Sequence, residues 1–463
     1  MYRKLILLGM AACLCGCVRP QKYARPALPV PPAWSASPAS AGDAPEATAV
    51  KWQEFFTDQR LRSVIELALA NNRDLRTAAL NVEKVQALYR IQSAARYPTV
   101  SASAGGNGYR LPADLSRDHK AQTVGEFTVG AGVASWEVDL FGRIRSLKSR
   151  ALEQYFATEQ ARSAAQIALV AAVANSYLAL AADRDNLRLA QETLRAQQAS
   201  YDLILRTREA GMASDLDLRQ AQSQVEAARV DIARYAGQVA LDENALNLLA
   251  GTPVPANLLS SRLDSDVPLK EIAAGVPSEV LLRRPDILMA EHQLKAAEAN
   301  IGAARAAFFP RITLTAALGF MSGNLSDLFN IGSRTWNLAP EAALPIFDSG
   351  ARKANLKVAQ VDRDAAIAEY EKAIQSAFRE VSDALSLRPR LLEQQNAQQA
   401  LVNTLEETYR LSEARYKAGV DSYLSVLVAQ RSLYGAQQAL VSLRMARLGN
   451  LVTLYKVLGG GVS

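Results

Sequence analysis

Apolar and polar positions change their period once within residues 281–320, and the change predicts a helix that leads directly into a strand. Apolar or small residues first recur at alternating steps of four and three, as on one face of a helix. These positions are Ala290, Leu294, Ala297, Ile301, Ala304 and Phe308. Half of them are alanine, so we expect a neighbouring helix to approach closely. Pro285 and Asp286 predict the helix start, because proline needs no N–H there and the carboxylate suits the positive end of the dipole.

After Pro310, which we expect to end this helix, apolar residues alternate with polar or small ones. The apolar set is Ile312, Leu314, Ala316, Leu318 and Phe320. A period of two is typical of a strand with one apolar face.

The chain repeats this design, which indicates an internal duplication. Gln53–Tyr97 contains no Gly or Pro, predicts one helix, and shares the register of the later helix at an offset of 212 residues. Each copy then contains a strand pair, at residues 98–140 and 310–347, with strands of about ten residues that suit a tilted membrane barrel. In the first pair the apolar parity switches near Ser135, which predicts a β-bulge or a strand end. In the second pair we expect an outward face made of Trp336, Leu338, Ala342, Leu344 and Ile346.

Very long helices follow each strand pair, and Gly142 and Gly350 mark the return from strand to helix. Arg143–Ala210 runs 68 residues without Gly or Pro. A helix of that length spans about 100 Å. The second copy repeats it in Ala351–Ala418, where Pro389 has no counterpart and predicts a kink or a change of helix segment.

Gly211 and Gly419, 208 residues apart, end these helices in turns, and shorter helices then return to Ala250 and Leu458. The uncharged stretch Ser163–Ala182 could be taken for a membrane span, but its alanines and polar residues favour a buried helix seam.

These patterns divide the chain into six segments. They are a lipoprotein signal peptide (1–16), an N-terminal tether or strap (17–51), a first structural repeat (52–251), an equatorial linker (252–280), a second structural repeat (281–458) and a C-terminal tail (459–463). We expect the strap, linker and tail to form a collar around the middle of the helices.

The first residues predict export and lipidation. Arg3 and Lys4 precede the apolar run Leu5–Leu14, as in a signal peptide. Leu14-Cys15-Gly16-Cys17 then resembles a bacterial lipoprotein signal, in which Cys17 is lipidated and becomes the mature N-terminus. The alternative is an ordinary secretory signal. Cys17 would be the one cysteine of the mature chain, so neither a disulfide framework nor a thiol metal site is expected.

Composition and charge argue against an enzyme and against nucleic-acid binding. Charged residues make up 21% and aromatic residues 6% of the 463 residues, which suits long helices packed through small side chains. The formal charge of +6 is spread among acidic residues along the helices, as on solvated faces. His119 lies in a predicted surface loop, and His292 lies on a helix beside Glu291 with no second ligand four residues later. No phosphate loop, nucleophile elbow or cluster of metal ligands is found. We therefore expect no catalytic residues, no metal and no cofactor other than the lipid on Cys17.

Three short sequence motifs within about forty residues match the pattern of a known family. They are LLRRPDI, AExxLxAAxAxIGxA and FPxIxL, in that order. The stretch resembles the signature of the TolC family of outer membrane efflux proteins, in its NodT-type (OprM-like) lipoprotein branch. The residue after Cys17 is Val18 and not Asp, which by family analogy favours the outer membrane.

Four strands per chain cannot close a membrane barrel, and unpaired edges are not tolerated in lipid. Two, three or four chains could pool their strands; the resemblance implies three. The expected fold is mainly α with membrane β: a trimeric 12-stranded β-barrel continued into the periplasm by a long α-helical coiled-coil barrel.

The resemblance implies the exit duct of a tripartite efflux pump, which conducts small molecules such as drugs or other toxic compounds passively to the exterior. Its partners would be a periplasmic adaptor, an inner-membrane transporter of the RND type and outer membrane lipid, in a Gram-negative bacterium. Two alternatives stay open: a structural coiled-coil lipoprotein, and a type I polypeptide export duct. A tether needs no strands, whereas a duct needs them in every copy.

The resemblance also implies a gate at the helix tips, in the turns at Gly211 and Gly419. Family members hold the closed state through polar contacts between these turns, with acidic rings inside. The candidate gate residues are Asp215, Asp217, Arg415, Tyr416 and Asp421. Asp217 and Tyr416 match one such contact, Arg415 is expected to bind the turn around Asp217, and Asp421 is the ring candidate. The alternative is that each aspartate caps a helix after a glycine break.

Overall fold

The computed structural model describes residues 23–32, 34, 51–260, 262–263 and 278–460. These residues form two compact units. The sheet unit takes in residues 82–158 and 290–370 together with the described residues up to Ala27. The hairpin unit takes in residues 159–289 and the described parts of 28–81 and 371–463. The division falls within the helices α4 (Arg73–Ala94), α5 (Arg143–Glu209), α7 (Pro285–Ala306) and α8 (Ala351–Lys417).

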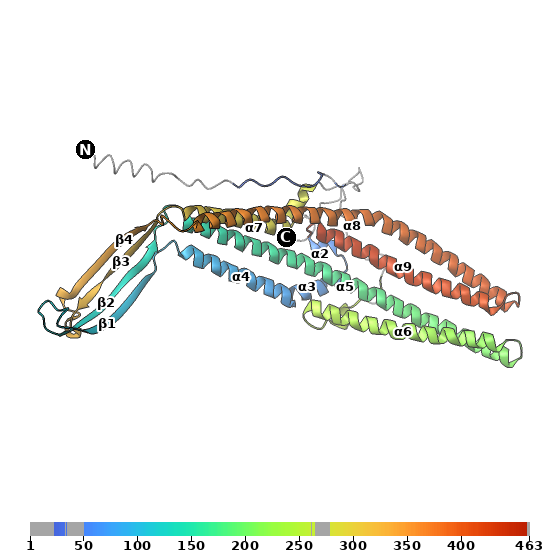
Figure 1. The fold of residues 1–463 in the computed structure, drawn as a ribbon. Helices are drawn as coiled ribbons and strands as arrows, with labels where there is room; N and C mark the ends of the chain where they lie inside the picture. The colour runs from blue at the N-terminus through green and yellow to red at the C-terminus, as the bar shows by residue number, and fades with distance from the viewer. Residues whose placement is uncertain (1–22, 33, 35–50, 261, 264–277, 461–463) are drawn as a thin grey trace. The chain divides into compact units, whose positions relative to one another are not determined.

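The sheet unit contains one antiparallel sheet in the order β1-β2-β3-β4. The strands are β1 (Val100–Leu111), β2 (Gln122–Glu137), β3 (Arg311–Ser322) and β4 (Arg334–Ala343). They lie side by side in Figure 1. Each predicted strand pair is confirmed, and the two pairs join because β2 pairs with β3.

The predicted end of the second strand pair is wrong, because β4 stops at Ala343 and leaves Leu344 and Ile346 outside the strand. Pro340 lies within β4, which is an edge strand of this chain's sheet, the place in a sheet where proline is tolerated. The predicted bulge is confirmed. The register between β2 and β3 shifts between Val133 and Trp136, and Ser135 takes a positive φ of 50°.

Each strand pair leads into a helix through a glycine with positive φ, at Gly142 (79°) and Gly350 (87°). An aspartate before each glycine then caps the helix. Asp139 accepts from the backbone N–H of Ile144 and Arg145, and Asp348 accepts from Gly350 and Arg352. Helices α5 (Arg143–Glu209) and α8 (Ala351–Lys417) begin at these caps, and each has 67 residues.

The long helices agree with the sequence, but Pro389 does not divide α8 into two segments. A proline inside a helix removes one backbone hydrogen bond, and the remaining turns keep the helix continuous here. Segment 163–182 lies within α5, which among the described residues is the one helix long and apolar enough to cross a membrane. Its side chains at Val173, Ala174 and Leu180 are fully buried, which agrees with the expected helix seam.

The single helix expected over Gln53–Tyr97 is wrong. The chain forms α2 (Trp52–Phe55), α3 (Gln59–Asn71) and α4 (Arg73–Ala94) instead. Two polar side chains cause the breaks. Asp58 caps α3 by accepting from the N–H of Arg60, and Asn72 accepts from the N–H of Leu75 at the start of α4. The predicted register is confirmed, because α4 begins 212 residues before α7 (Pro285–Ala306).

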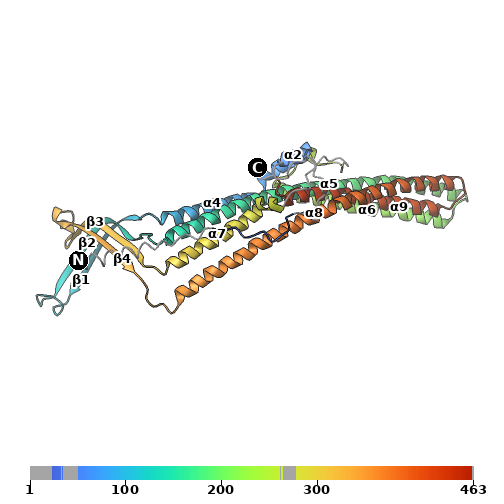
Figure 2. The ribbon, with the colours of Figure 1, turned by 90° about the horizontal axis from the view of Figure 1, so that it is seen from above.

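In the hairpin unit, α6 (Asp215–Ala250) returns antiparallel to α5, and α9 (Tyr423–Val457) returns antiparallel to α8. Figure 2 shows both pairs from a second direction. Short 3-10 helices at Ala256–Leu258 and Ser278–Arg283 flank residues 264–277, which lie outside the described part. The segment boundaries of the linker and tail, and their collar, stay predictions.

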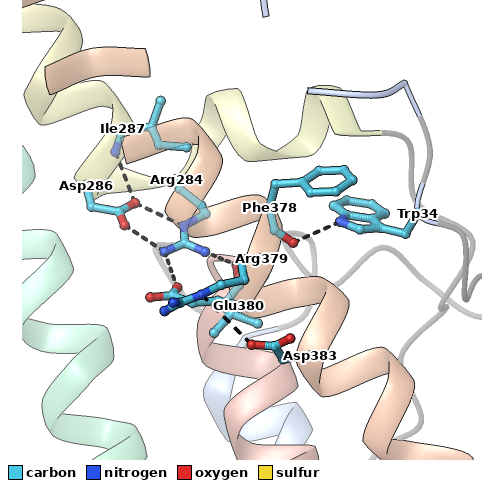
Figure 3. Close-up of polar contacts among 9 residues, drawn as sticks. Trp34, Arg284, Asp286, Ile287, Phe378, Arg379, Glu380 and Asp383 are labelled. Atoms are coloured by element: carbon cyan, nitrogen blue, oxygen red, sulfur yellow. Dashed lines mark hydrogen bonds and ion pairs between the residues drawn. The ribbon is translucent and has the colours of Figure 1, made fainter. Parts of the chain in front are cut away.

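A buried arginine joins three helices of the hairpin unit (Figure 3). Arg284 precedes α7, pairs with Asp286 at 2.7 Å and with Glu380 of α8 at 2.9 Å, and donates to the carbonyl oxygen of Val457 in α9. The second arginine of the LLRRPDI motif therefore connects the start of α7 with α8 and with the end of α9. Beside it, the Trp34 ring stacks on Phe378 and its Nε1 donates to the Phe378 carbonyl.

Candidate functional site

The two helix-tip turns have the same backbone design. Gly211 and Gly419 take φ values of 75° and 72°, a left-handed conformation that glycine adopts without strain. In each turn the residue after the glycine donates its N–H to a carbonyl five residues earlier, from Met212 to Thr207 and from Val420 to Arg415. This pattern satisfies the last carbonyls of α5 and α8. A Cβ at either glycine would meet no atom within 4 Å, so the backbone angle and not space requires glycine.

Serines, and not aspartates, occupy the N-cap positions of the returning helices. Ser214 caps α6 and forms a capping box with Asp217, whose carboxylate accepts from the Ser214 N–H and hydroxyl. Ser422 occupies the N-cap of α9. The alternative that each aspartate is an N-cap is therefore wrong, although Asp217 does contribute to helix capping from the third position.

Each turn also contains an ion pair between its two arms. Arg208 pairs with Asp215 at 2.7 Å, and Arg415 pairs with Asp421 at 2.6 Å. The Arg415 hydrogen bond is the main cause that holds the pKa of Asp421 below its usual range. Within the described chain Arg415 thus bonds its own turn, and its expected bond to the turn around Asp217 is not formed in this single chain.

An apolar cluster beneath the turns joins the two hairpins. We call it the tip cluster, and its buried members are Ile204, Ala221, Tyr423, Val426 and Leu427. Partly buried residues from both turns pack against it, including Ala213, Leu218 and Tyr416. Because both hairpins contribute, apolar contact in the tip cluster joins the two turns of one chain.

Asp217 and Tyr416, matched by sequence as a pair, lie close enough to interact through charge. Burial raises the pKa of Tyr416, and the Asp217 carboxylate raises it further. The Tyr416 ring lies 5.4 Å from that of Tyr423, whose pKa is raised to about 12, chiefly by burial. The structure therefore brings these two predicted gate residues into one neighbourhood, while the gate itself stays a prediction.

Sequence reasoning missed a second connection between the hairpins, along α6 and α9. The Tyr434 hydroxyl donates to Asp231 at 3.0 Å, and Gln438 Nε2 donates to the Tyr235 hydroxyl at 3.0 Å. Both pairs are separated by 203 residues, and within each helix the partners are four residues apart. The sequence does show polar residues four positions apart in each of these two helices, and residues four apart lie on the same helix face. That spacing could have predicted the contact.

The N-terminal strap is described only from Tyr23, so Cys17 and the signal peptide lie outside the described residues. In the sheet unit, Arg25 makes two hydrogen bonds to Glu291 of α7, at 2.8 and 3.3 Å. The Glu291 side chain is 3% exposed and also pairs with Lys295 at 3.1 Å. A charge-assisted contact with a buried carboxylate therefore fixes the strap to α7.

The two histidines occupy unrelated places. His119 lies in the loop between β1 and β2, and His292 of α7 contacts Glu153 of α5 through Nδ1 at 2.7 Å. Among the described residues, no group of three or more His, Cys, Asp or Glu is arranged to hold a metal ion.

Comparisons with known proteins agree with this architecture. A family model described as outer membrane efflux protein matches residues 64–252 and 276–460. The chain is 47% identical to the toluene efflux pump outer membrane protein TtgC of Pseudomonas putida, over 100% of this chain and 96% of that protein. It is equally similar to the antibiotic efflux pump outer membrane protein ArpC of Pseudomonas putida, with 47% identity and the same coverage.

A solved structure shows the same fold. The crystal structure of the open state of the MtrE outer membrane channel from Neisseria gonorrhoeae matches with a TM-score of 0.89 and 38% identity. The match covers 96% of this chain and 99% of that chain. The strands in both repeats, which a structural tether would not need, are thus shared with a membrane channel.

Proposed function

Since the chain belongs to the outer membrane efflux protein family and is the outer membrane channel of an efflux pump, we propose that three copies form its exit duct. Each copy contributes four strands to a 12-stranded barrel, and the long helices continue the barrel into the periplasm. The duct conducts small molecules passively and is gated at the helix tips.

The open sheet is the observation that supports assembly from several copies, and the family resemblance supports three of them. In one chain β1 and β4 are edge strands, so each leaves a row of backbone N–H and C=O groups without partners in the sheet. In lipid every such group costs several kcal/mol unless it is bonded. Pairing β4 of one copy with β1 of the next satisfies both edges, and closure with three copies gives 12 strands.

Disulfide cross-linking in native membranes tests this closure. Within one chain two strands lie between β1 and β4, so three strand spacings, about 14 Å, separate them, which is too far for a disulfide. Cysteines at Ser103 in β1 and Asn337 in β4, with neighbouring positions scanned for register, should therefore link only different chains. We expect a covalent ladder that stops at three.

The matched control places cysteines at Thr128 and Met321, which face each other in β2 and β3 of one chain. This pair should oxidise within the chain and leave a monomer on a denaturing gel. A β1–β4 cysteine variant that reaches the membrane folded but forms no link at any scanned register, or a ladder that continues past three, contradicts the proposed assembly.

We propose that a periplasmic adaptor and an inner-membrane transporter of the RND type complete the pump. The toluene and antibiotic pumps named for the relatives support small toxic compounds of these kinds as substrates. Expression in a strain that lacks its own outer membrane channels should restore resistance to such compounds. Export of a polypeptide without any gain of resistance would favour the type I duct instead.

We further propose that Cys17 carries a covalent lipid. The signal-like sequence before Cys17 supports this. Metabolic palmitate labelling should mark the wild-type protein and be lost in Cys17→Ala, while the strands still hold the variant in the membrane. An unlabelled wild type would contradict lipidation and leave the channel proposal untouched.

A further inference from the structure

The two ends of the four-stranded sheet differ in charge. Loops 112–121 and 323–333 connect the strands at one end and contain two basic and three acidic residues. Residues 138–150 and 344–357 lead from the other end into α5 and α8, and contain seven basic and two acidic residues. We call the seven bases the junction patch: Arg143, Arg145, Lys148, Arg150, Arg352, Lys353 and Lys357.

The two acids of these segments, Asp139 and Asp348, are already engaged as helix caps. Arg352 pairs with Asp348 at 2.6 Å, and Arg143 pairs with Glu137 at 2.7 Å. Arg145 forms a longer ion pair with Asp139, at 3.4 Å, and its side chain is still 62% exposed. Neither Lys353 nor Lys357 pairs with a carboxylate within the described part of the chain. The junction patch therefore keeps an excess of exposed positive charge.

Both repeats place an exposed base at the same position. Arg145 and Lys353 are the third residues after Gly142 and Gly350, the glycines of positive φ that begin α5 and α8. The adjacent positions differ between the repeats, since Ile144 corresponds to Arg352 and Lys148 to Leu356. The shared base is thus a feature of each strand-to-helix junction and not of one local sequence.

Exposed aromatic side chains lie at the same end of the sheet. Tyr97 before β1 is 69% exposed, and Phe347 after β4 is 86% exposed. Phe308 and Phe309 precede β3 and are partly exposed. Aromatic residues at the ends of membrane strands lie at the level of the lipid headgroups. Bases within two helical turns of them reach headgroup phosphates with their long side chains.

We propose that the junction patch binds the phosphate groups of anionic phospholipids in the periplasmic leaflet of the outer membrane, with Arg145 and Lys353 as the main contacts. Charge complementarity and continuity with the membrane strands identify this partner. The opposite end of the sheet, which faces the exterior, carries no such excess of bases. The proposal needs the chain in a membrane, but it does not depend on the number of copies or on the gate.

Lipid titration of the full-length protein in mild detergent, followed by native mass spectrometry, tests the proposal. We expect the wild type to bind phosphatidylglycerol more tightly than zwitterionic phosphatidylethanolamine. A base near an anionic membrane surface strengthens binding by about fivefold. Arg145→Gln with Lys353→Gln should therefore weaken phosphatidylglycerol binding by at least about tenfold and leave phosphatidylethanolamine binding unchanged.

The control variant Arg162→Gln with Lys372→Gln removes two exposed bases from the same helices farther from the sheet. It should bind both lipids as the wild type does. If the glutamine variant does not fold, the charge-conserving pair Arg145→Lys with Lys353→Arg still tests the patch, because it should keep the preference for phosphatidylglycerol.

Three results would overturn the proposal. One is equal binding of the two lipids by the wild type, and another is unchanged phosphatidylglycerol binding by the glutamine variant. The third is displacement of phosphatidylglycerol by inorganic phosphate alone, which would make the patch a site for free anions.

Discussion

Arg284 Nη1 donates to the carbonyl oxygen of Val457 at 2.7 Å, which connects the start of α7 with the last turn of α9. The first repeat has the same connection with a different side chain, because Asn72 Nδ2 donates to the carbonyl oxygen of Leu249 at 2.9 Å. The donors are 212 and the acceptors 208 residues apart, which are the offsets of the duplication. The two repeats thus share this hydrogen bond at equivalent positions. Its donor is a neutral amide in the first repeat and a charged guanidinium in the second.

Arg284→Ala should destabilise the hairpin unit. The Arg284 side chain is 9% exposed, and its loss leaves Glu380 and the Val457 carbonyl without this donor and removes two of the hydrogen bonds that Asp286 accepts. Both carboxylates are about 40% exposed, so we expect a loss of about 2–4 kcal/mol and a lower thermal midpoint in detergent. Arg379→Ala is the control, because Arg379 lies in the same region, is 76% exposed and is 3.9 Å from Asp383. Its effect should stay within about 0.5 kcal/mol, and equal effects of the two variants would contradict this role for Arg284.

Features that depend on the local backbone could be predicted from the sequence. Gly142, Gly211, Gly350 and Gly419 all take positive φ where the sequence placed turns. The bulge at Ser135 was also predictable, because a change of apolar parity requires an extra residue in the strand. The break at Asn72 was not predicted, since an asparagine inside an apolar helical pattern can equally remain in the helix.

Features that depend on long-range partners could not be predicted. Asp217 and Tyr416 were found only through resemblance, and the tip cluster around Tyr423 was not anticipated at all. Its members come from α5, α6 and α9, and the helical period shows which face is apolar but not which helix covers it. The sequence likewise does not show which carboxylate Arg415 binds. We expected the turn around Asp217, whereas the partner is Asp421, six residues later in the same turn.

Asp183→Asn should remove a pH dependence of the stability of the fold, which arises where α5 packs against α6. Arg184 and Glu243 bond across this contact at 2.6 Å, which places their neighbours Asp183 and Asp242 together. Burial, and then the hydrogen bond and charge of Asp242, raise the pKa of Asp183 to about 6. Asn186 and Arg234 face the same carboxyl and oppose the rise.

The sign follows from proton linkage. The folded chain holds the proton more tightly than the unfolded chain, so the stability that it provides is lost as pH rises through about 6. In Asp183→Asn the amide can donate to Asp242 at every pH, so the variant should exceed the wild type by about 1 kcal/mol above that pH, after allowance for solvent screening. Thermal midpoints at about pH 5 and about pH 8 measure this. The control is Asp202→Asn, an exposed change on α5, which should leave the wild-type pH dependence intact. If Asp183→Asn shows the wild-type pH dependence as well, Asp183 and Asp242 do not share a proton.

Arg25→Ala should release the N-terminal strap from α7. Burial by itself raises the pKa of Glu291, but hydrogen bonds from Arg25 and Lys295 outweigh it and leave the pKa below its ordinary value. The ion pair therefore stabilises the fold at neutral pH, and its contribution is lost as pH falls below the ordinary carboxyl range. Hydrogen exchange of residues 23–32 should rise in the variant at neutral pH.

Two variants separate charge from hydrogen-bond geometry at this contact. Arg25→Lys keeps the charge and loses the two-pronged geometry, so its exchange should be intermediate. Glu291→Gln should match Arg25→Ala at neutral pH and approach the wild type in acid, where the wild-type carboxyl is itself protonated. Exchange that is unchanged by Arg25→Ala would mean that other contacts, such as Lys295 over the Tyr23 ring, hold the strap.

The tip turns permit a charge test of the gate, because Arg415 and Asp421 neutralise each other within one turn. In the proposed trimer, Asp421→Ala leaves three unpaired arginines around the axis, and Arg415→Ala leaves three unpaired aspartates. Like charges in a narrow pore interact more strongly than on an open surface, so single-channel recordings should show opposite shifts in cation selectivity for the two variants. The double variant restores neutrality and should return selectivity close to that of the wild type.

Tyr416→Phe and Asp217→Ala leave this ion pair in place but weaken the contact between the turns, so both should raise the conductance of the closed state. Tyr416→Phe removes no charge and should also leave selectivity unchanged. Selectivity that does not respond to either single charge change would place the narrowest point of the pore away from this turn.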